Sequence, residues 1–445
     1  MPLLPDGSFA PASSRPRVLV VGGGAAGLVI ARDLARAGVA VTILEASDRV
    51  GGQLASARVD GLEVDTAAES FATRNGTVAA LAAELGLGED LVRPLERPAW
   101  VIGAGGRAHP LPAASVLGIP GDPLAHDVAS AIGRLRTWRA ALDRLSPLRP
   151  PEAYRSLGDL VRRRMGAGVL TELVAPVVRG VYSTTPDELP LALASPGLPD
   201  ALRANRSLGA AVLTLRAASA AGSQVAGLRG GVHRLATALA MDAAAHGARI
   251  ILGARVTGVD ATGVTLADGE VLEGRVVIAA ASAAGPAPRT RAITVAVAVL
   301  DAPDLDAAPR GTGALITSGA PGITARALTH SSAKWAWVAD SLPTGRHLVR
   351  LSYDELPDDP EATVAADLRA VTGARVGPIR DLHVRTWTRT LQAAPAPPGG
   401  IAVGEAAGTT GLAGIVAAAR ARAQRIIGEA DSTDAKAARS GGTEG

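Results

Sequence analysis

The chain has 445 residues, of which 47% are hydrophobic and 20% are charged, and its net charge is only +3. This composition indicates a folded protein and excludes a disordered one, and a chain of this length is expected to divide into at least two domains. There is no cysteine, which excludes disulfides and thiolate metal sites.

The first residues do not combine a basic region with an apolar core, so they lack the pattern of a signal peptide. We expect residues 1–15 to be a flexible leader and the protein to be cytoplasmic. No apolar run reaches the roughly 18 residues that span a bilayer. Arginines are frequent in residues 134–164, where they would either attract anions such as lipid headgroups or lie on solvated helix faces. Peripheral contact with a membrane therefore stays open, and no nucleic-acid partner is indicated.

A dinucleotide-binding pattern begins at residue 18. An apolar strand over residues 18–21 runs into three glycines spaced G-x-G-x-x-G, and a helix is predicted to follow up to residue 37. Such glycines allow a tight turn, close approach of the backbone to phosphates, and close packing of the helix on the strand. The helix would direct its N-terminal amides at a pyrophosphate. The candidate contacts in this loop are Gly22, Gly24, Ala25, Ala26 and Gly27.

A second apolar strand follows at residues 39–44 and ends at Glu45. The carboxylate of Glu45 is placed to accept hydrogen bonds from the hydroxyls of an adenosine ribose. It does not by itself distinguish NAD from FAD. A glycine-rich turn without any ligand is the structural alternative.

Further along the chain, the pattern changes several times. A proline-rich loop at residues 111–124 precedes a helical stretch at 125–175. A strand, a glycine pair and a helix are predicted over 225–240, and Asp268-Gly269 suits a hairpin turn. The other expected strands cover residues 62–65, 248–252, 271–280, 293–300, 312–317, 325–330, 347–353 and 401–405. Helices are expected at 78–87 and from the last strand to residue 427.

These elements predict an α/β fold with a discontinuous, Rossmann-like nucleotide-binding domain. We assign residues 16–75, 225–285 and 398–428 to it. Residues 76–110 and 286–397 would form a substrate domain on a mixed sheet. Residues 111–224 would form an inserted helical lobe, and residues 429–445 a disordered tail.

Five segments resemble the bacterial coproporphyrinogen III oxidase and protoporphyrinogen oxidase family, within the flavin amine oxidase superfamily, and a sixth, an Arg-x-Gly-Gly element, resembles that superfamily as a whole. Two lie near the nucleotide loop, namely the Arg-x-Gly-Gly element at residues 49–52 and the run Asp65-Thr66-Ala67-Ala68-Glu69-Ser70-Phe71. Others are the loop at 111–123, the lobe core at 162–189 and the turn Leu228-Arg229-Gly230-Gly231. The last is the segment 327–335, which is followed by 349–353.

The resemblance implies a glutathione-reductase-like FAD domain, with the flavin held non-covalently. Arg49 and the backbone around it would hold the pyrophosphate and the flavin side of the cofactor. The further cofactor contacts that it implies are Glu45, Ala46, Gly51, Gly52, Ala68, Glu69, Ser70, Val256, Gly404, Glu405, Gly411, Leu412 and Ala413.

The resemblance also implies an activity, the oxygen-dependent, six-electron oxidation of coproporphyrinogen III to coproporphyrin III, with release of hydrogen peroxide, in haem biosynthesis. The substrate bears four propionates, so cationic partners are expected, with Arg74 first and Arg179 and Arg229 after it. Structural salt bridges are the alternative for each arginine. Lys334 is expected beside flavin N5, where amine oxidases have a lysine that holds a water, and a plain surface lysine is its alternative. No metal is expected, and a transient partner enzyme of the haem pathway would fit.

The chain also departs from the family. Ala67 or Ala68 replaces a glycine, Gln53 stands where many relatives have a basic residue, and a segment after Trp387 is missing. Oxidation of protoporphyrinogen IX, another FAD-dependent amine oxidase or desaturase activity, and a diverged paralogue without turnover therefore stay open.

Overall fold

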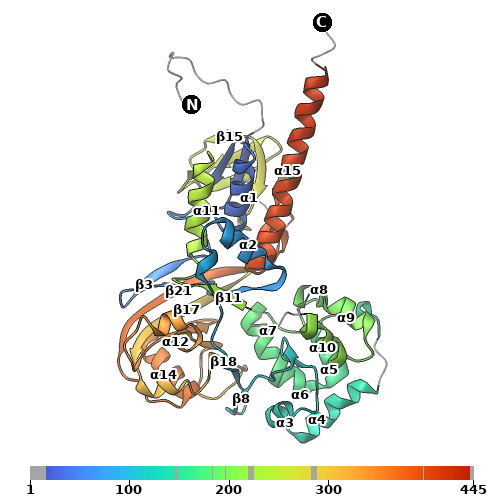
Figure 1. Ribbon diagram of the computed structural model, residues 1–445, viewed down its shortest axis with the longest axis vertical. Coiled ribbons are helices and arrows are strands. Elements are labelled where there is room, and N and C mark those ends of the chain that lie inside the picture. The colour runs from blue at the N-terminus through green and yellow to red at the C-terminus, as the bar shows by residue number, and fades with distance from the viewer. Residues whose placement is uncertain are drawn as a thin grey trace.

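The computed structural model describes residues 17–145, 149–182, 184–195, 197–218, 225–281, 288–393 and 395–440. The leader expected at residues 1–15 and the last residues of the chain, 441–445, lie outside this part. The long axis carries a parallel sheet at one end, and a mixed sheet and a helical lobe lie beside each other at the other end (Figure 1).

The parallel sheet has the strand order β12-β2-β1-β16-β22. Its strands are β1 (Val18–Val21), β2 (Val41–Leu44), β12 (Arg249–Ile251), β16 (Arg275–Ile278) and β22 (Gly400–Ala402). Every pair of neighbours is parallel. The central strand β1 is fully buried, as expected for a parallel sheet covered on both faces. Three distant segments of the chain thus build one sheet.

The two faces of β1 pack against different layers. Val18 and Val20 pack into a core with the helices α1 (Ala25–Arg36), α11 (Arg234–Ala245) and α15 (Leu412–Ser440). Leu19 and Val21 pack against a small antiparallel sheet on the other side. The strands of that sheet are β13 (Val256–Val259), β14 (Gly263–Leu266) and β15 (Val271–Glu273).

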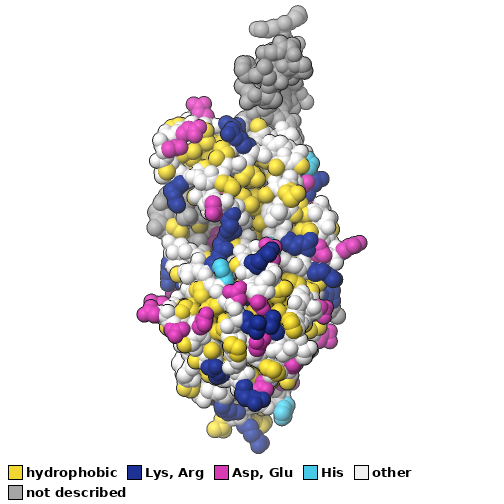
Figure 2. All heavy atoms as spheres, turned by 90° about the vertical axis from the view of Figure 1, so that its left-hand side faces the viewer, with side chains coloured by type: hydrophobic (Ala, Val, Ile, Leu, Met, Phe, Trp, Pro, Cys, Tyr) yellow, Lys and Arg dark blue, Asp and Glu magenta, His cyan; other side chains and the backbone are white. Residues whose placement is uncertain are grey.

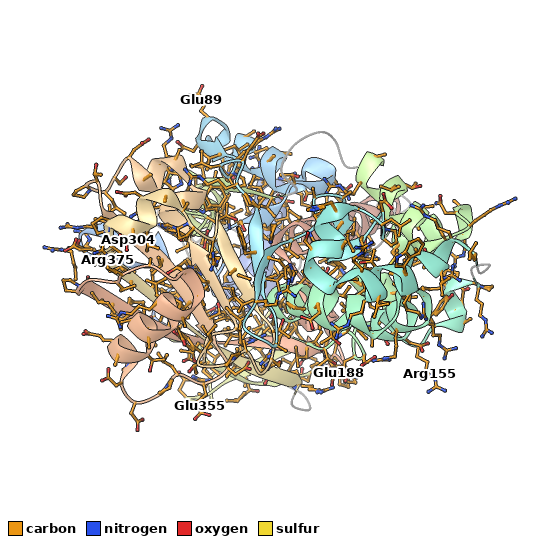
Figure 3. All side chains as sticks on the ribbon, turned by 90° about the horizontal axis from the view of Figure 1, so that it is seen from below. Glu89, Arg155, Glu188, Asp304, Glu355 and Arg375 are labelled. Carbon is orange, nitrogen blue, oxygen red and sulfur yellow. The ribbon has the colours of Figure 1, made fainter. Side chains whose placement is uncertain are left out.

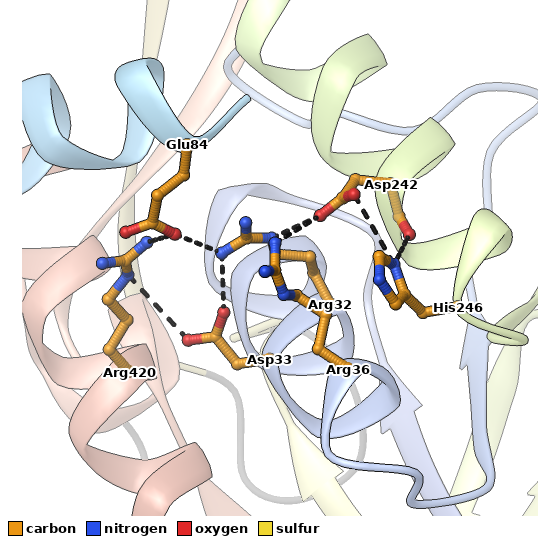
Figure 4. Close-up of polar contacts among 7 residues, drawn as sticks. All are labelled: Arg32, Asp33, Arg36, Glu84, Asp242, His246 and Arg420. Carbon is orange, nitrogen blue, oxygen red and sulfur yellow. Dashed lines mark hydrogen bonds and ion pairs between the residues drawn. The ribbon is translucent and has the colours of Figure 1, made fainter. Parts of the chain in front are cut away.

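A buried arginine joins the helices on the first face. Arg32 of α1 is 1% exposed and donates to Asp242 of α11 at 2.6 Å and to Glu84 of α2 (Thr77–Glu84) at 2.7 Å. Arg420 of α15 donates to the same Glu84 at 2.6 Å (Figure 4). Because a buried charge needs partners, these four helices are fixed to one another around the nucleotide loop.

The second sheet has seven strands in the order β21-β17-β20-β19-β18-β7-β8. It is mixed, because β18 runs parallel to β7 and the other pairs are antiparallel. One face packs on α14 (Pro360–Thr372). The strands are β7 (Ala99–Ile102), β8 (Ala108–Pro110), β17 (Arg289–Asp301), β18 (Gly313–Ile316), β19 (Ala327–His330), β20 (Arg346–Tyr353) and β21 (Ile379–Gln392).

The helical lobe has a hydrophobic core of its own. Seen from below, it lies beside the seven-stranded sheet (Figure 3). Glu188 of the lobe accepts a 2.9 Å hydrogen bond from Arg289 of β17. The main helices of the lobe are α3 (His126–Ile132), α4 (Arg134–Ala141), α5 (Leu157–Met165), α7 (Ala175–Tyr182), α9 (Leu198–Ala204) and α10 (Leu208–Ala218).

The predicted α/β fold with a parallel sheet, a mixed sheet and a helical lobe is confirmed. The expectation that a disordered tail begins at residue 429 needs correction, because α15 continues to Ser440. Four of residues 430–440 are alanine, the best helix former. The proline-rich loop also contains two short paired strands, β9 (Ser115–Val116) and β10 (Ile119–Pro120).

Candidate active site

The glycine loop joins β1 to α1 and has the shape that its spacing predicts. Gly22 adopts φ +102°, and a Cβ on Gly27 would lie 1.9 Å from the Gly22 carbonyl oxygen. These positions therefore require glycine. A Cβ on Gly24, by contrast, would meet no described atom within 4 Å, so the space in front of the N-terminus of α1 is open to a ligand.

Glu45 follows the end of β2 and closes over this loop. Its Oε2 accepts a 2.7 Å hydrogen bond from the backbone N–H of Gly23, and its Oε1 accepts one from the N–H of Ser47 at 2.9 Å. The carboxylate is thus held beside the glycine loop. The segment before Val256 runs alongside, since the N–H of Ala254 donates to the Glu45 carbonyl at 2.8 Å.

The Arg-x-Gly-Gly element packs on the same loop. The N–H of Gly51 donates to the carbonyl of Gly23 at 2.8 Å, and a backbone bridge joins Gly51 to Gly24. Arg49 donates to the carbonyls of Val50 and Gly52 at 3.2 and 3.1 Å. Its guanidinium is thus held on the turn at Gly52, and a Cβ on Gly52 would lie 3.3 Å from the Cα of Gly24.

A second arginine, Arg385 of β21, lies near Arg49. Burial and the like charge of Arg49 lower the pKa of Arg385. Among the described residues, the hydrogen bonds of both arginines go to neutral groups, including Thr66 Oγ1, which lies 3.3 Å from Arg385. Trp387, on the same face of β21, has a buried Nε1 donor without a described partner. Two like charges and a free donor suit a polyanionic ligand.

The last segment of the chain returns to this place. Gly404 adopts φ +64°, and a Cβ there would lie 2.5 Å from that of Ala26. Glu405 accepts a 3.0 Å hydrogen bond from the side-chain amide of Gln53. Burial raises the pKa of Glu405. At the start of α15, the carbonyl of Ala413 accepts a 3.1 Å hydrogen bond from Thr77.

The run at residues 65–71 connects the glycine loop to the seven-stranded sheet. The N–H of Ala68 donates to the Gln53 carbonyl at 3.1 Å, and the Ala67 carbonyl accepts a 2.7 Å hydrogen bond from Arg350 of β20. Asp65 accepts hydrogen bonds from the backbone N–H groups of Val232 and His233 before α11, at 2.8 and 2.9 Å. This run is therefore held in place from both sides.

Glu69 is the centre of a buried ionic network. Its Oε1 lies 3.1 Å from Lys334 Nζ and accepts a 2.6 Å hydrogen bond from the indole of Trp335. Its Oε2 pairs with Arg350. Burial opposes ionisation of Glu69, but Lys334 and Arg350 outweigh it, and the pKa of Glu69 is lowered to about 2. The carboxylate is therefore charged at neutral pH.

A cavity of about 20 Å³ lies against this network, and Glu69, Trp335 and Arg350 are among its lining residues. It has room for a single water. Two buried polar atoms of lining residues, Ser331 Oγ and Arg350 Nε, have no described hydrogen-bond partner. The cavity thus combines the size and the polar groups that an internal water needs.

Four arginines meet where the lobe touches the seven-stranded sheet, and we call them the arginine cluster. Its members are Arg179 of α7, Arg291 of β17, Arg326 just before β19 and Arg389 of β21. Asp354 pairs with three of them: Arg179 at 2.6 Å, Arg291 at 2.7 Å and Arg326 at 3.1 Å.

The arginine cluster has more positive than negative charge. Burial and the three neighbouring arginines lower the pKa of Arg326 to about 10, although Asp354 opposes the shift. Arg389 lies near Glu405, and burial lowers the pKa of Arg389 as well. Four guanidiniums thus face two carboxyls, those of Asp354 and Glu405, so the cluster is suited to an anionic ligand.

The structure brings most of the predicted site residues together. The glycine loop, Glu45, Arg49, Gly51, Gly52, Glu69, Lys334, Gly404 and Glu405 surround one region or bond to one another. Arg179 belongs to the arginine cluster. Arg229 has no described contact with the cluster: its backbone N–H donates to the carbonyl of Asp90 at 2.8 Å, and its carbonyl accepts a 2.6 Å hydrogen bond from Arg234. The side chain of Arg74 lies outside the described residues. Among those residues, no group of three or more His, Cys, Asp or Glu side chains could hold a metal ion.

The sequence reasoning missed Arg291, Arg326, Arg385, Trp387 and Arg389, and gave no role to Arg350. Arginine and tryptophan alternate with threonine over residues 385–389. That period of two could have indicated a strand with one functional face.

These residues fit FAD. The open space at Gly24 lies at a helix N-terminus and could take a pyrophosphate, as could the like-charged pair of Arg49 and Arg385. The buried donor of Trp387 could supply a further polar contact. Glu45 is held at the position from which it could bind a ribose.

Comparison with known proteins agrees with this geometry. The family model for flavin-containing amine oxidoreductases matches residues 25–307. A coproporphyrinogen III oxidase of Mycobacterium tuberculosis is 31% identical over 407 residues, covering 84% of this chain and 86% of its own. The enzyme of the same name from Mycobacterium leprae is 32% identical over 402 residues, covering 83% of this chain and 86% of its own.

A solved structure has the same fold. The crystal structure of a putative protoporphyrinogen oxidase from Exiguobacterium sp. 255-15 superposes with a TM-score of 0.76 at 23% identity, covering 94% of this chain and 99% of its own. The chain therefore belongs to the coproporphyrinogen III oxidase family of flavin-containing amine oxidoreductases and is an FAD-dependent oxidoreductase.

Proposed function

We propose that this protein binds FAD non-covalently and oxidises coproporphyrinogen III to coproporphyrin III, with O₂ as the acceptor and hydrogen peroxide as the second product. The arginine cluster carries the proposal, because its excess of positive charge is suited to a substrate with several carboxylates. The names of the mycobacterial relatives support the same substrate and a role in haem biosynthesis.

The FAD would be held by segments from both ends of the chain. The amides at the N-terminus of α1 and the guanidiniums of Arg49 and Arg385 would bind the pyrophosphate. Glu45 would bind the ribose, with Ala46 and Val256 beside the adenosine. Residues 68–70, Glu405 and the start of α15 from Gly411 would line the flavin end. The absence of cysteine excludes a tether through sulfur, which supports non-covalent binding.

Bound FAD would supply the redox chemistry, namely acceptance of a hydride from a substrate carbon and transfer of the electrons to O₂. The protein's own part is to orient the macrocycle and to control charge. Lys334 is held 3.1 Å from the Glu69 carboxylate in a mostly buried site, and the small cavity that Glu69 lines has room for one water. We assign to this pair the role of promoting oxygen reduction.

The arginine cluster also bears on the choice of substrate. Four guanidiniums would repel an ammonium group, which disfavours an amine. Protoporphyrinogen IX has two carboxylates and coproporphyrinogen III has four, so the latter can neutralise more of the cluster. We therefore expect coproporphyrinogen III to be the better substrate.

Spectroscopy and turnover test the proposal on the full-length chain. The purified protein should show flavin absorbance, and acid precipitation should release the flavin into the supernatant. Addition of coproporphyrinogen III should then produce porphyrin fluorescence together with peroxide. Bound flavin without porphyrin formation would contradict the proposed substrate and would favour a paralogue without turnover.

Substitution of the arginine cluster tests the role of charge. Arg179→Gln and Arg291→Gln should each lower kcat/KM for coproporphyrinogen III by about tenfold, the value of one charged hydrogen bond, with a smaller loss for protoporphyrinogen IX. Arg162→Gln is the matched control, because Arg162 is an exposed lobe arginine that pairs with Asp187. Equal losses for both substrates would argue against carboxylate recognition by the cluster.

A further inference from the structure

Two buried histidines face each other where β19 ends and β20 begins. His330 and His347 are 3% and 7% exposed, and their ring nitrogens Nε2 and Nδ1 lie 3.0 Å apart. On the face of the molecule that Figure 2 shows, by contrast, acidic and basic side chains are interspersed, as expected of a solvated surface. Neither histidine belongs to the proposed cofactor or substrate contacts. A buried polar contact of this kind rigidifies the elements that it joins.

The ring of His347 also contacts two further segments. Its Nδ1 lies 3.1 Å from the hydroxyl oxygen of Ser332. Its Nε2 lies 3.1 Å from the carboxylate of Asp306, in the turn after β17. The ring thus connects β20 with the end of β19, with the segment after β19 and with this turn.

Both rings are uncharged at neutral pH. Burial lowers the pKa of His347, although Asp306 opposes the shift. Burial, the neighbouring ring and Arg97 lower the pKa of His330 to about 3. The carboxylate beside Nε2 favours the tautomer of His347 that has its proton there. Its Nδ1 is then an acceptor, which faces the Ser332 hydroxyl and His330.

These contacts fix the beginning of the short helix α12 (Ser331–Lys334). His330 is the residue before it and Ser332 is its second residue, so one ring nitrogen of β20 contacts both. A helix of four residues is too short to be stable by itself. Its other end is held by the N–H of Leu95, which donates to the Lys334 carbonyl at 2.8 Å. The orientation of α12 therefore depends on contacts from outside the helix.

The helix α12 joins the histidines to the ionic network of Glu69. Ser331 lines the small cavity at that network, whereas Ser332, the next residue, contacts His347. Lys334 ends the helix, and its Nζ lies 3.1 Å from Glu69. A shift at the start of this helix would therefore displace Lys334 as well.

We propose that His347 is a positioning residue for Lys334, which it holds in place through Ser332 and α12. This role rests on the proposed function in one respect, namely that Lys334 promotes the reduction of oxygen. A misplacement of about 1 Å can slow a reaction about 100-fold, so the loss of an anchor two residues before Lys334 should be measurable.

Reoxidation of the flavin tests this role without any porphyrinogen. The full-length chain with its FAD is reduced with stoichiometric dithionite, mixed with O₂ and followed by stopped-flow absorbance. His347→Phe removes both ring nitrogens and should slow reoxidation by about three- to tenfold. Ser332→Ala breaks the same contact from the side of α12 and should have the same effect. His109→Phe is the matched control and should leave the rate unchanged, because His109 is also 7% exposed but lies in β8, at the edge of the same sheet.

A conservative variant tests the contact made by Nδ1. His347→Asn places an amide oxygen near the position of Nδ1, so its reoxidation rate should stay within about twofold of the wild-type rate. A rate as low as that of His347→Phe would show that this acceptor is not what holds α12, and would contradict the proposal.

The Lys334→Met background shows whether His347 acts through Lys334. If Lys334→Met slows reoxidation, His347→Phe should cause no further slowing in that background. Equal slowing by His347→Phe in both backgrounds would overturn the proposal.

Stability separates the positioning role from the oxygen chemistry. A well-placed Lys334 also supports its ion pair with Glu69, so His347→Phe and Lys334→Met should be non-additive in urea unfolding, by about threefold or more in the unfolding constant. This coupling is decisive if Lys334→Met leaves reoxidation unchanged. Its presence would then mean that the oxygen role of Lys334 in the proposed function fails while the positioning role stands, and additive effects would overturn the positioning role as well.

Discussion

The ammonium of Lys334 lies 3.1 Å from the carboxylate of Glu69, and the two side chains are only 16% and 11% exposed. Lys334 comes from the turn after β19, whereas Glu69 comes from the run that connects the glycine loop to the seven-stranded sheet. This ion pair therefore ties the mixed sheet to the proposed flavin site. It also gives Lys334 a defined position, which a plain surface lysine would not have.

Replacing Glu69 by glutamine should destabilise the protein strongly. The change removes the partner of two largely buried cations, Lys334 and Arg350, and such a loss costs about 3–5 kcal/mol. Urea unfolding at neutral pH measures it. Glu63→Gln is the control, since Glu63 is 60% exposed and should cost less than about 1 kcal/mol. A loss no larger than that of the control would mean that the network has little energetic importance.

The same variant should change the pH dependence of stability. The pKa of Glu69 is lowered from 4.5 to about 2 in the folded state, so its ionisation stabilises the fold above pH 4.5, and this contribution is lost as the pH falls toward 2. The shift corresponds to about 3 kcal/mol. The gap in unfolding free energy between wild type and Glu69→Gln should therefore narrow as the pH is lowered through this window. A difference in unfolding free energy that grows as the pH is lowered would contradict this prediction.

Replacing Lys334 by methionine tests the proposed role in oxygen reduction. Glu69 keeps Arg350 as a partner, so the protein should fold and retain its flavin. We expect reoxidation of the reduced flavin by O₂ to slow by about tenfold or more, as for the loss of one positioned charge. Stopped-flow absorbance measures this rate. An unchanged rate in a flavin-loaded variant would exclude the role.

Arg385 should contribute to FAD affinity. Arg385→Gln removes one of the two like charges beside the glycine loop, and the loss of one charged hydrogen bond of about 1.5–3 kcal/mol raises Kd about 10- to 100-fold. Titration of the apoprotein with FAD measures it. Arg380→Gln on the same strand is the control, because Arg380 pairs with Asp301 and is 42% exposed. If both variants bind FAD equally, Arg385 does not contact the cofactor.

The local part of the site could be predicted from the sequence. The glycine spacing, the strand at residues 18–21 and Glu45 at the end of the next strand depend on neighbours in the chain, and the structure reproduces them. The sequence identified Lys334 and Glu69 as candidate site residues, but it did not predict the contact between them. It arises from tertiary packing, which no local pattern encodes.

The strand β21 shows why the other residues of the candidate site were not predicted from the sequence. Residues 379–392 alternate in exposure along the strand, but the side that faces the proposed flavin site displays Arg385, Trp387 and Arg389 instead of aliphatic residues. A strand is recognised in a sequence by its apolar face. When that face carries charged and polar side chains for a ligand, the alternation of apolar and polar residues that indicates a strand is absent.

Gly24→Ala separates the ligand site from the fold. The new Cβ would meet no described atom within 4 Å, so the stability of the apoprotein should change by less than about 1 kcal/mol. The methyl group would nevertheless occupy the space in front of the N-terminus of α1, so FAD affinity should fall by about tenfold or more. Gly404→Ala is the contrasting variant, because Gly404 has φ +64° and its Cβ would lie 2.5 Å from that of Ala26. It should reduce apoprotein stability and FAD affinity together. Thermal unfolding of each apoprotein, followed by FAD titration, distinguishes the two effects, and full FAD affinity in Gly24→Ala would place the pyrophosphate elsewhere.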